Sequence, residues 1–176
     1  MPNPMDQVIS KGAGLVNEIK ARLDGLVGVF NTLAEQHGEA GALLKLARGD
    51  IDKRAELWPA IRAALRAHEQ GELREVYPVL DNYPELQTLV KRHDTEASQL
   101  SQTVDQMDAL NPRSVEFETL LNKLIGLIKA HVEEEEKHIF PTAQTVIGED
   151  RAREIEPKFL AVATHVKNTD LRVAKS

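Results

Sequence analysis

Four histidines and two glutamates have the residue types and the spacing of a metal site. The six are His37, His68, Glu72, His93, His131 and Glu135. Each histidine falls on the apolar stripe of a segment with helical periodicity, and each glutamate follows a histidine by four residues, on the same helix face. Buried imidazoles and carboxylates cost free energy unless they are paired, and together they suit iron, manganese or zinc. Six donors exceed one tetrahedral zinc, so we expect two metals, each with two histidines, sharing two carboxylates.

An internal repeat carries part of this set. The segment from His68 to Glu72 is followed by Tyr77-Pro78, and the segment from His131 to Glu135 is followed at the same offset by Phe140-Pro141. The pattern H-x3-E-x4-[YF]-P therefore occurs twice, 63 residues apart, in a chain with only four Phe and two Tyr. Two such units predict two helical hairpins related by a pseudo-twofold axis around a symmetric dinuclear centre.

Helical periodicity dominates the chain and predicts the elements that position these side chains. We expect an all-α, up-down-up-down four-helix bundle within residues 22–145, with an N-terminal helical arm over 1–21 and a C-terminal helix and polar tail over 146–176. The first, third and fourth bundle helices are expected to end near Gly49, Ala109 and Phe140-Pro141, and Tyr77-Pro78 is expected to end or kink the second. The last amphipathic segment covers about 149–167. Asp50 and Ser114 are suited to cap the second and fourth helices.

Composition excludes several other classes of protein. The chain has 176 residues, a net charge of −6 and no Cys, which excludes thiolate nucleophiles, disulfide frameworks and Cys-ligated clusters. The acidic balance argues against nucleic acid as a partner. No apolar run is long enough for a membrane span, and no signal peptide is evident at the start. We therefore expect one cytoplasmic domain without a membrane partner.

The chain resembles the hemerythrin family, specifically the bacterial HHE cation-binding domains, over about residues 22–145. The resemblance rests on the six residues above and on the segments REVYPVL and KHIFPTA, which close the second and fourth helices. It implies two non-haem irons with an oxo or hydroxo bridge, for which manganese or zinc could substitute. By this resemblance His37 and His68 hold one iron, His93 and His131 hold the other, and two carboxylates bridge them. These are Glu72 and Glu135.

One position departs from the oxygen-carrying members of that family. They have a second His four residues after the third-helix ligand, where this chain has Ala97. The iron beside His93 and His131 is then expected to be open to dioxygen, peroxide or nitric oxide. This favours a protein that binds or reacts with a small oxidant. A non-enzymatic oxygen or iron sensor, working through a protein partner or a second copy at the N-terminal arm, is the alternative.

Some neighbouring residues compete for roles at the site. Glu136 rivals Glu135, which is preferred for its stripe position and its match to Glu72. His138 shares a face with His131 but lacks the second Glu-x-x-His motif of ferritin-like sites. Tyr77 is expected to pack at a helix end, with a hydrogen bond to the site as the alternative.

Overall fold

The computed structural model describes residues 25–173, and every regular element in this range is helical. The expected all-α fold is therefore confirmed, whereas the predicted N-terminal arm and the last three residues lie outside the described range. The elements are α2 (Val29–Gly49), α3 (Ile51–Gly71), η1 (Glu72–Val76), α4 (Tyr77–Leu80), α5 (Gln87–Asp108), α6 (Val115–Glu134), η2 (Glu135–Ile139), α7 (Phe140–Ile147) and α8 (Glu149–Val173).

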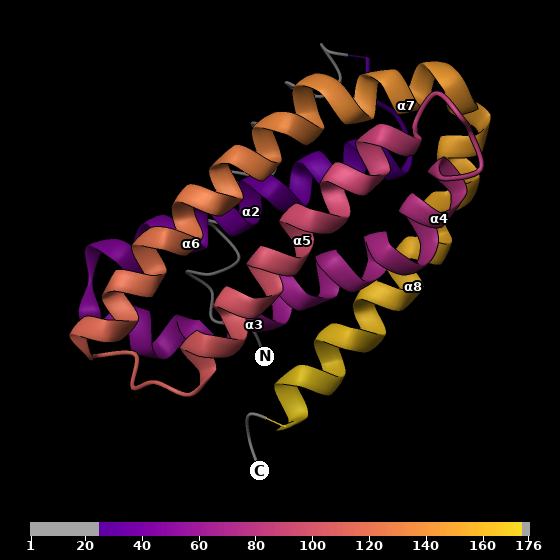
Figure 1. Ribbon diagram of the computed structural model, residues 1–176. Coiled ribbons are helices and arrows are strands. Elements are labelled where there is room, and N and C mark those ends of the chain that lie inside the picture. Colours follow the sequence, from indigo (N-terminus) through magenta and orange to yellow (C-terminus); the bar gives the residue numbers. More distant parts are fainter. Residues whose placement is uncertain (1–24, 174–176) are drawn as a thin grey trace.

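Four long helical stretches run alternately up and down the bundle (Figure 1). They are α2, then α3 with η1 and α4, then α5, then α6 with η2 and α7. The two predicted caps are present. Asp50 accepts hydrogen bonds from the backbone N–H groups of Asp52 and Lys53, and Ser114 accepts one from Phe117. Both caps satisfy first-turn donors that a helix leaves without a partner.

The second and fourth bundle helices continue through their prolines. Phe140-Pro141 was expected to stop the fourth helix, and this expectation is wrong, because the helix runs on to Ile147. A π-helical turn precedes the aromatic residue in both repeats, where the N–H of Tyr77 reaches the carbonyl of Glu72 and that of Phe140 reaches Glu135. Each proline then takes an early position in the α-helical turn that follows, where its missing N–H breaks little.

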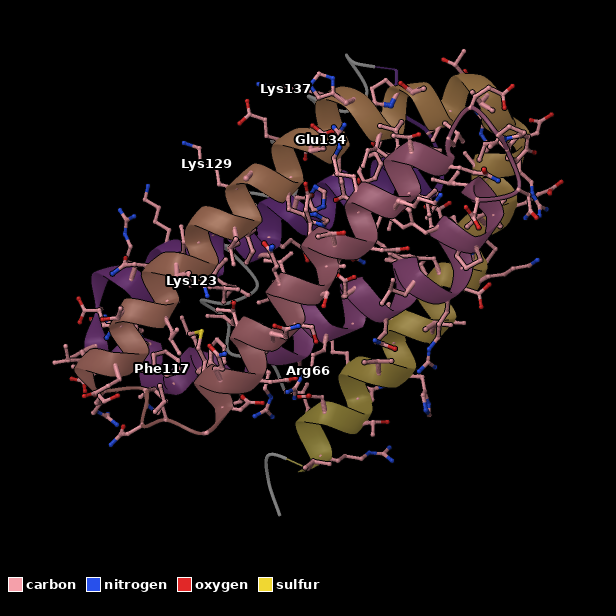
Figure 2. The ribbon with its side chains drawn as sticks, in the orientation of Figure 1. Arg66, Phe117, Lys123, Lys129, Glu134 and Lys137 are labelled. Atoms are coloured by element: carbon pink, nitrogen blue, oxygen red, sulfur yellow. The ribbon has the colours of Figure 1, made fainter. Side chains whose placement is uncertain are left out.

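The apolar core consists of two clusters at opposite ends of the bundle. The first cluster includes Phe30, Leu33, Tyr77, Phe140 and Phe159. The second cluster includes Leu44, Trp58, Met107, Phe117 and Leu121. Six buried or half-buried polar residues, the predicted site residues, lie at the level between them. On the outer face of the fourth bundle helix, Lys123 and Lys129 of α6 and Lys137 of η2 are exposed (Figure 2).

Helix α8 covers the outside of the bundle and extends further than its expected end near residue 167. It packs along α3 and against part of α2 (Figure 1). Asp170 of α8 forms ion pairs with Arg62 and Arg66 of α3 at 2.9 Å. Within residues 25–173, no helix combines the length and the apolar character that crossing a membrane requires.

Candidate metal centre

The six predicted residues come together in the middle of the bundle, in two adjoining groups. One group consists of His37, His68 and Glu135, and the other of Glu69, Glu72, His93 and His131. Within each group, one nitrogen or oxygen atom per residue lies within 4.8 Å of the others. The histidine pairs are those that the sequence predicts, with α2 and α3 supplying one pair and α5 and α6 the other.

The two predicted bridging glutamates each approach histidines of both groups. Glu72 Oε2 lies 3.4 Å from Nε2 of His68 and 3.5 Å from Nε2 of His93. Glu135 Oε2 lies 3.1 Å from Nε2 of His37 and 3.3 Å from Nε2 of His131. Both carboxylates are fully buried. Their position between the groups is the one that a shared carboxylate requires.

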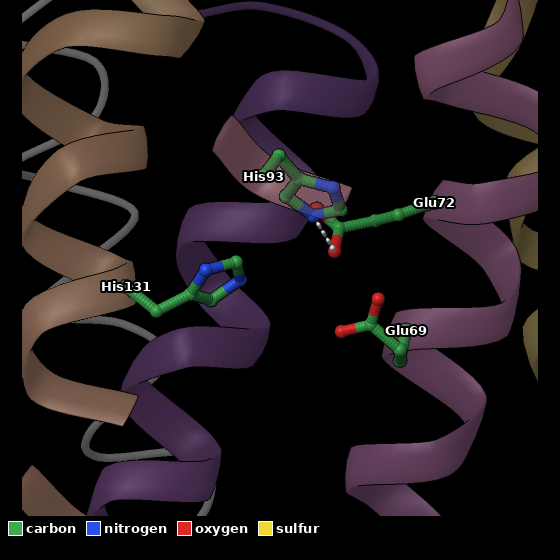
Figure 3. A group of neighbouring side chains, drawn as sticks. All are labelled: Glu69, Glu72, His93 and His131. Carbon is green, nitrogen blue, oxygen red and sulfur yellow. Dashed lines mark ion pairs between the residues drawn. The ribbon is translucent and has the colours of Figure 1, made fainter. Parts of the chain in front are cut away.

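Glu69 is a site residue that the sequence analysis missed. Its carboxylate lies with Glu72, His93 and His131 (Figure 3). The available signal was its spacing, since Glu69 precedes Glu72 by three residues and so shares its helix face. The group at His93 and His131 thus has an additional acidic donor, whereas the group at His37 and His68 has none among the described residues. The group at His37 and His68 therefore has fewer donors than the group at His93 and His131.

Three of the four histidines are oriented by an oxygen acceptor behind the ring. Nδ1 of His37 donates to Glu136 at 3.1 Å, Nδ1 of His68 to Gln36 at 2.9 Å, and Nδ1 of His131 to Glu96 at 3.1 Å. When Nδ1 carries the only proton of the ring, Nε2 can act as a ligand at the centre. Glu136, the alternative to Glu135, therefore supports His37 from behind and belongs to neither group. Glu96, next to Ala97, supports His131 in the same way.

The rings of His93 and Tyr77 stack on each other within the site. Their centroids lie 3.4 Å apart, with an interplanar angle of 15°. The Tyr77 hydroxyl donates a 2.6 Å hydrogen bond to Oε1 of Glu135. Of the two roles considered for Tyr77, the structure thus shows both, packing and a hydrogen bond to a site carboxylate. The π turn that begins at Glu72 ends directly before Tyr77, so one local distortion positions both side chains.

The buried donor atoms at the centre fit a bound cation. Nε2 of His68, His93 and His131, both oxygens of Glu72 and Oε1 of Glu69 have no hydrogen-bond partner among the described residues, and Nε2 of His37 and Oε2 of Glu135 face each other at 3.1 Å. Buried polar atoms are almost always hydrogen-bonded, so this number of unsatisfied atoms facing one volume requires an explanation. A bound metal would give all of these atoms a partner. The nitrogen and oxygen donor set suits iron, manganese or zinc.

Comparison with known families agrees with the geometry. Residues 17–143 match the hemerythrin HHE cation binding domain. The chain belongs to this family. The matched region contains all seven residues of the two groups and ends before α8. No curated protein and no solved structure shows significant similarity to the chain.

In this HHE domain, opposite charges at the centre favour a protonated His37 and an ionised Glu135. Burial alone would lower the pKa of His37, but the carboxylates of Glu135 and Glu136 raise it to about 9. Burial alone would raise the pKa of Glu135, but His131, His37 and His93 hold it below its usual range. Glu135 is therefore ionised at neutral pH and His37 is protonated until a metal displaces the proton.

The other two carboxylates at the centre of this HHE domain have raised pKa values. Burial, together with the charges of Glu135 and Glu69, raises the pKa of Glu72 well above its ordinary value. Burial likewise raises the pKa of Glu69 to about 7. Burial lowers the pKa of His93 to about 4 and also lowers that of His68, which keeps both imidazoles neutral. Two neutral imidazoles are ready to bind a metal, whereas Glu72 and Glu69 must first lose protons.

Proposed function

We propose that this HHE domain is a non-haem diiron protein that binds or reacts with a small oxidant, namely dioxygen, peroxide or nitric oxide. The observation that supports it best is the pair of adjoining donor groups with two fully buried carboxylates between them. Two bound irons would supply redox and Lewis-acid chemistry. Manganese or zinc could occupy the same donors.

The residues of the domain have distinct tasks under this proposal. His37 and His68 hold one ion, and His93, His131 and Glu69 hold the other, with Glu72 and Glu135 shared. Glu136, Gln36 and Glu96 fix three imidazole rings in the ligating tautomer through Nδ1. The Tyr77 hydroxyl donates a hydrogen bond to Glu135 and holds this carboxylate in place.

The unequal donor sets suggest where an oxidant meets the site. Beyond the two shared carboxylates, three residues serve one ion and two residues serve the other. An ion with fewer protein ligands keeps coordination positions for exogenous molecules, as open catalytic sites do in general. We place this open position on the side of His37 and His68.

Metal content together with the optical spectrum tests the proposal. We expect about two irons per chain, with near-ultraviolet and visible bands of a bridged ferric pair that bleach on reduction and respond to air, peroxide or nitric oxide. The variant His68→Ala should lose iron from one position, and His138→Ala, an exposed histidine, serves as the control. One zinc per chain, or no metal, would contradict the diiron proposal.

A further inference from the structure

Helices α2 and α8 start at the same end of the bundle, where α7 lies, and a groove opens between them further along (Figure 1). At the start of both helices, a Cβ atom on Gly28 would lie 2.5 Å from the backbone of Ala152. One turn later the Thr32 hydroxyl donates to the Glu156 carboxylate. The groove that follows has a volume of about 1070 Å³ and is bounded by α2, α3 and α8 at its outer part.

The groove has a mixed lining of apolar and charged side chains. Leu43 of α2 lines one side, and Leu160 and Leu171 of α8 line the other, with Leu160 40% exposed. Glu39 of α2 and Lys167 of α8 stand on the same two sides. Uncovered leucines flanked by charges are typical of a groove that receives an amphipathic helix, whose apolar face contacts the leucines.

The described part of the chain begins beside the closed end of this groove. The carbonyl of Gly25 accepts a hydrogen bond from Nε2 of Gln144, and the N–H of Val27 donates to Oε1 of the same side chain. The residues that precede Gly25 therefore start where α2 and α8 meet. As a helix, residues 5–23 would span about 28 Å, which equals the rise of α8 from Ala152 to Leu171.

Residues 5–23 have the sequence pattern of a helix with one apolar face. The apolar residues of this segment fall within one third of a helical turn: Met5, Val8, Ile9, Leu15, Val16, Ile19 and Leu23. Gly12 and Gly14 each weaken an isolated helix by about 1 kcal/mol. A helix of this length is marginal on its own, so we expect it to form only against a surface that covers its apolar face.

We propose that residues 5–23 dock in this groove as an amphipathic helix and close the side of the bundle that leads to His37 and His68, which line the inner end of the groove. The inference goes beyond the proposed function and needs no bound metal. Helix α8, which forms one wall, lies outside residues 17–143, the region that matches the HHE domain.

Two arguments favour this segment over a second copy of the chain as the occupant. A segment tethered at Gly25 has an effective concentration on the order of millimolar at the groove, which a separate molecule does not reach. The charges also match, because Lys11 borders the apolar face of the segment and Glu39 borders the groove. Lys11 precedes Gly25 by as many residues as Glu39 follows it, so the two come to a similar level along the bundle.

Hydrogen–deuterium exchange of the full-length, metal-free protein tests the docking. We expect the amides of residues 5–23 to exchange at least about tenfold more slowly than those of an unfolded chain. Leu160→Asn should remove this protection, and Leu73→Asn, at a leucine of similar exposure outside the groove, should keep it. Ile19→Asn makes the same test from the segment itself, with Asn17→Ser as its control.

Three results of the exchange experiment would overturn the docking. The first is a wild-type segment without protection, and the second is equal protection in the Leu160→Asn and Leu73→Asn variants. The third is protection that increases with protein concentration, which would assign the groove to a second copy of the chain.

Chemical modification of the metal-free protein tests whether the docked segment closes the groove. We expect diethyl pyrocarbonate to modify His68 at least about fivefold faster in Leu160→Asn than in Leu73→Asn, because the reagent enters once the segment is released. The exposed His138 lies outside the groove and should react at equal rates in both variants. Mass spectrometry of the peptides measures each histidine separately, and equal rates at His68 would overturn the closing role.

Discussion

At the scale of single residues, Glu135 is the group that holds the site together. Three histidines lie within 3.5 Å of its oxygens, and the Tyr77 hydroxyl donates to it. A fully buried carboxylate remains ionised only where such partners compensate for lost hydration. The same contacts make Glu135 available as a metal ligand at neutral pH, whereas Glu72, with no such donor, must give up a proton first.

Removing the hydroxyl that supports Glu135 should weaken the fold. We expect Tyr77→Phe to lower the free energy of unfolding by about 1.5–3 kcal/mol at pH 7, because the lost hydrogen bond is made to a charged, buried acceptor. The ring and its stacking on His93 remain. Tyr83→Phe, at a half-buried tyrosine between α4 and α5, is the matched control. Urea denaturation of both variants measures the difference, and equal stability of the two would show that the hydroxyl contributes nothing.

Metal binding should release protons and strengthen as the pH rises. In the metal-free protein the pKa of His37 is about 9 and that of Glu69 about 7, so at pH 7 His37 holds a proton and Glu69 is about half protonated. The raised pKa of Glu72 adds a further proton. A metal must displace these protons, so affinity falls as pH falls from about 9 to about 6.

Calorimetric titration with Zn²⁺ in buffers of different ionisation enthalpy counts the released protons. We expect more than one proton per chain at pH 7, because His37 and Glu72 each lose one. Glu69→Gln should reduce the number, and Glu85→Gln, at an exposed position between α4 and α5, should not. A metal affinity that stays constant from about pH 6 to about pH 9 would refute this protonation scheme.

The sequence predicted the donor residues on the inner faces of the helices, but it did not predict the residues that accept hydrogen bonds from the histidine Nδ1 atoms. The four histidines and two glutamates were predictable because helical periodicity alone places them on one face. Gln36, Glu96 and Glu136 reach across to a histidine on a neighbouring helix, and this depends on how the helices are rotated against each other. That rotation is set by packing and leaves no local signal.

At the scale of elements, the two π turns account for the pattern that the two repeats share, from His68 to Pro78 and from His131 to Pro141. One turn begins at Glu72 and the other at Glu135, and each ends before an aromatic residue followed by proline. The extra residue in the turn changes the direction of the side chains that follow. The aromatic-proline pair was predictable as a break in regular helix, but whether a break ends a helix or distorts it depends on the hydrogen bonds made across it.

Helix α8 constrains the junction of α3 and η1, where His68 and Glu72 lie. A Cβ atom on Gly71 would lie 2.5 Å from the Phe159 ring, and that ring meets His68 edge-on at 6.3 Å between centroids. We expect Gly71→Ala to lower the free energy of unfolding by about 1–3 kcal/mol through overpacking. Gly126→Ala, also inside a helix but with nothing within 4 Å, should instead raise it by about 0.5–1 kcal/mol.

Thermal and denaturant unfolding of the two variants provide the comparison. Since both replace glycine by alanine within a helix, helix propensity is common to them and the contact with Phe159 is the difference. A stabilised Gly71→Ala variant would mean that α8 does not hold its ring against α3. Metal content of the same variant shows whether the displaced ring also disturbs His68.

At the scale of the whole molecule, the bundle is two apolar clusters separated by a polar layer. Without a metal the layer reduces stability, because its buried oxygens and nitrogens lack partners. A bound metal would give these atoms partners, and its binding free energy would then add to the folding free energy. A site of this kind lowers the stability of the metal-free protein and raises its affinity for a metal.

Replacing one buried carboxylate by an apolar side chain of similar size should separate the two effects. We expect Glu72→Met to raise the free energy of unfolding of the metal-free protein by about 1–2 kcal/mol, because two unsatisfied buried oxygens disappear. The same variant should lose most of the stabilisation that iron or zinc gives the wild-type protein. Glu154→Met, at an exposed position of α8, should change neither quantity by more than about 0.5 kcal/mol. Denaturant unfolding with a chelator and with excess metal measures both effects, and a Glu72→Met variant that is less stable without metal would show that the polar layer is already satisfied in the empty bundle.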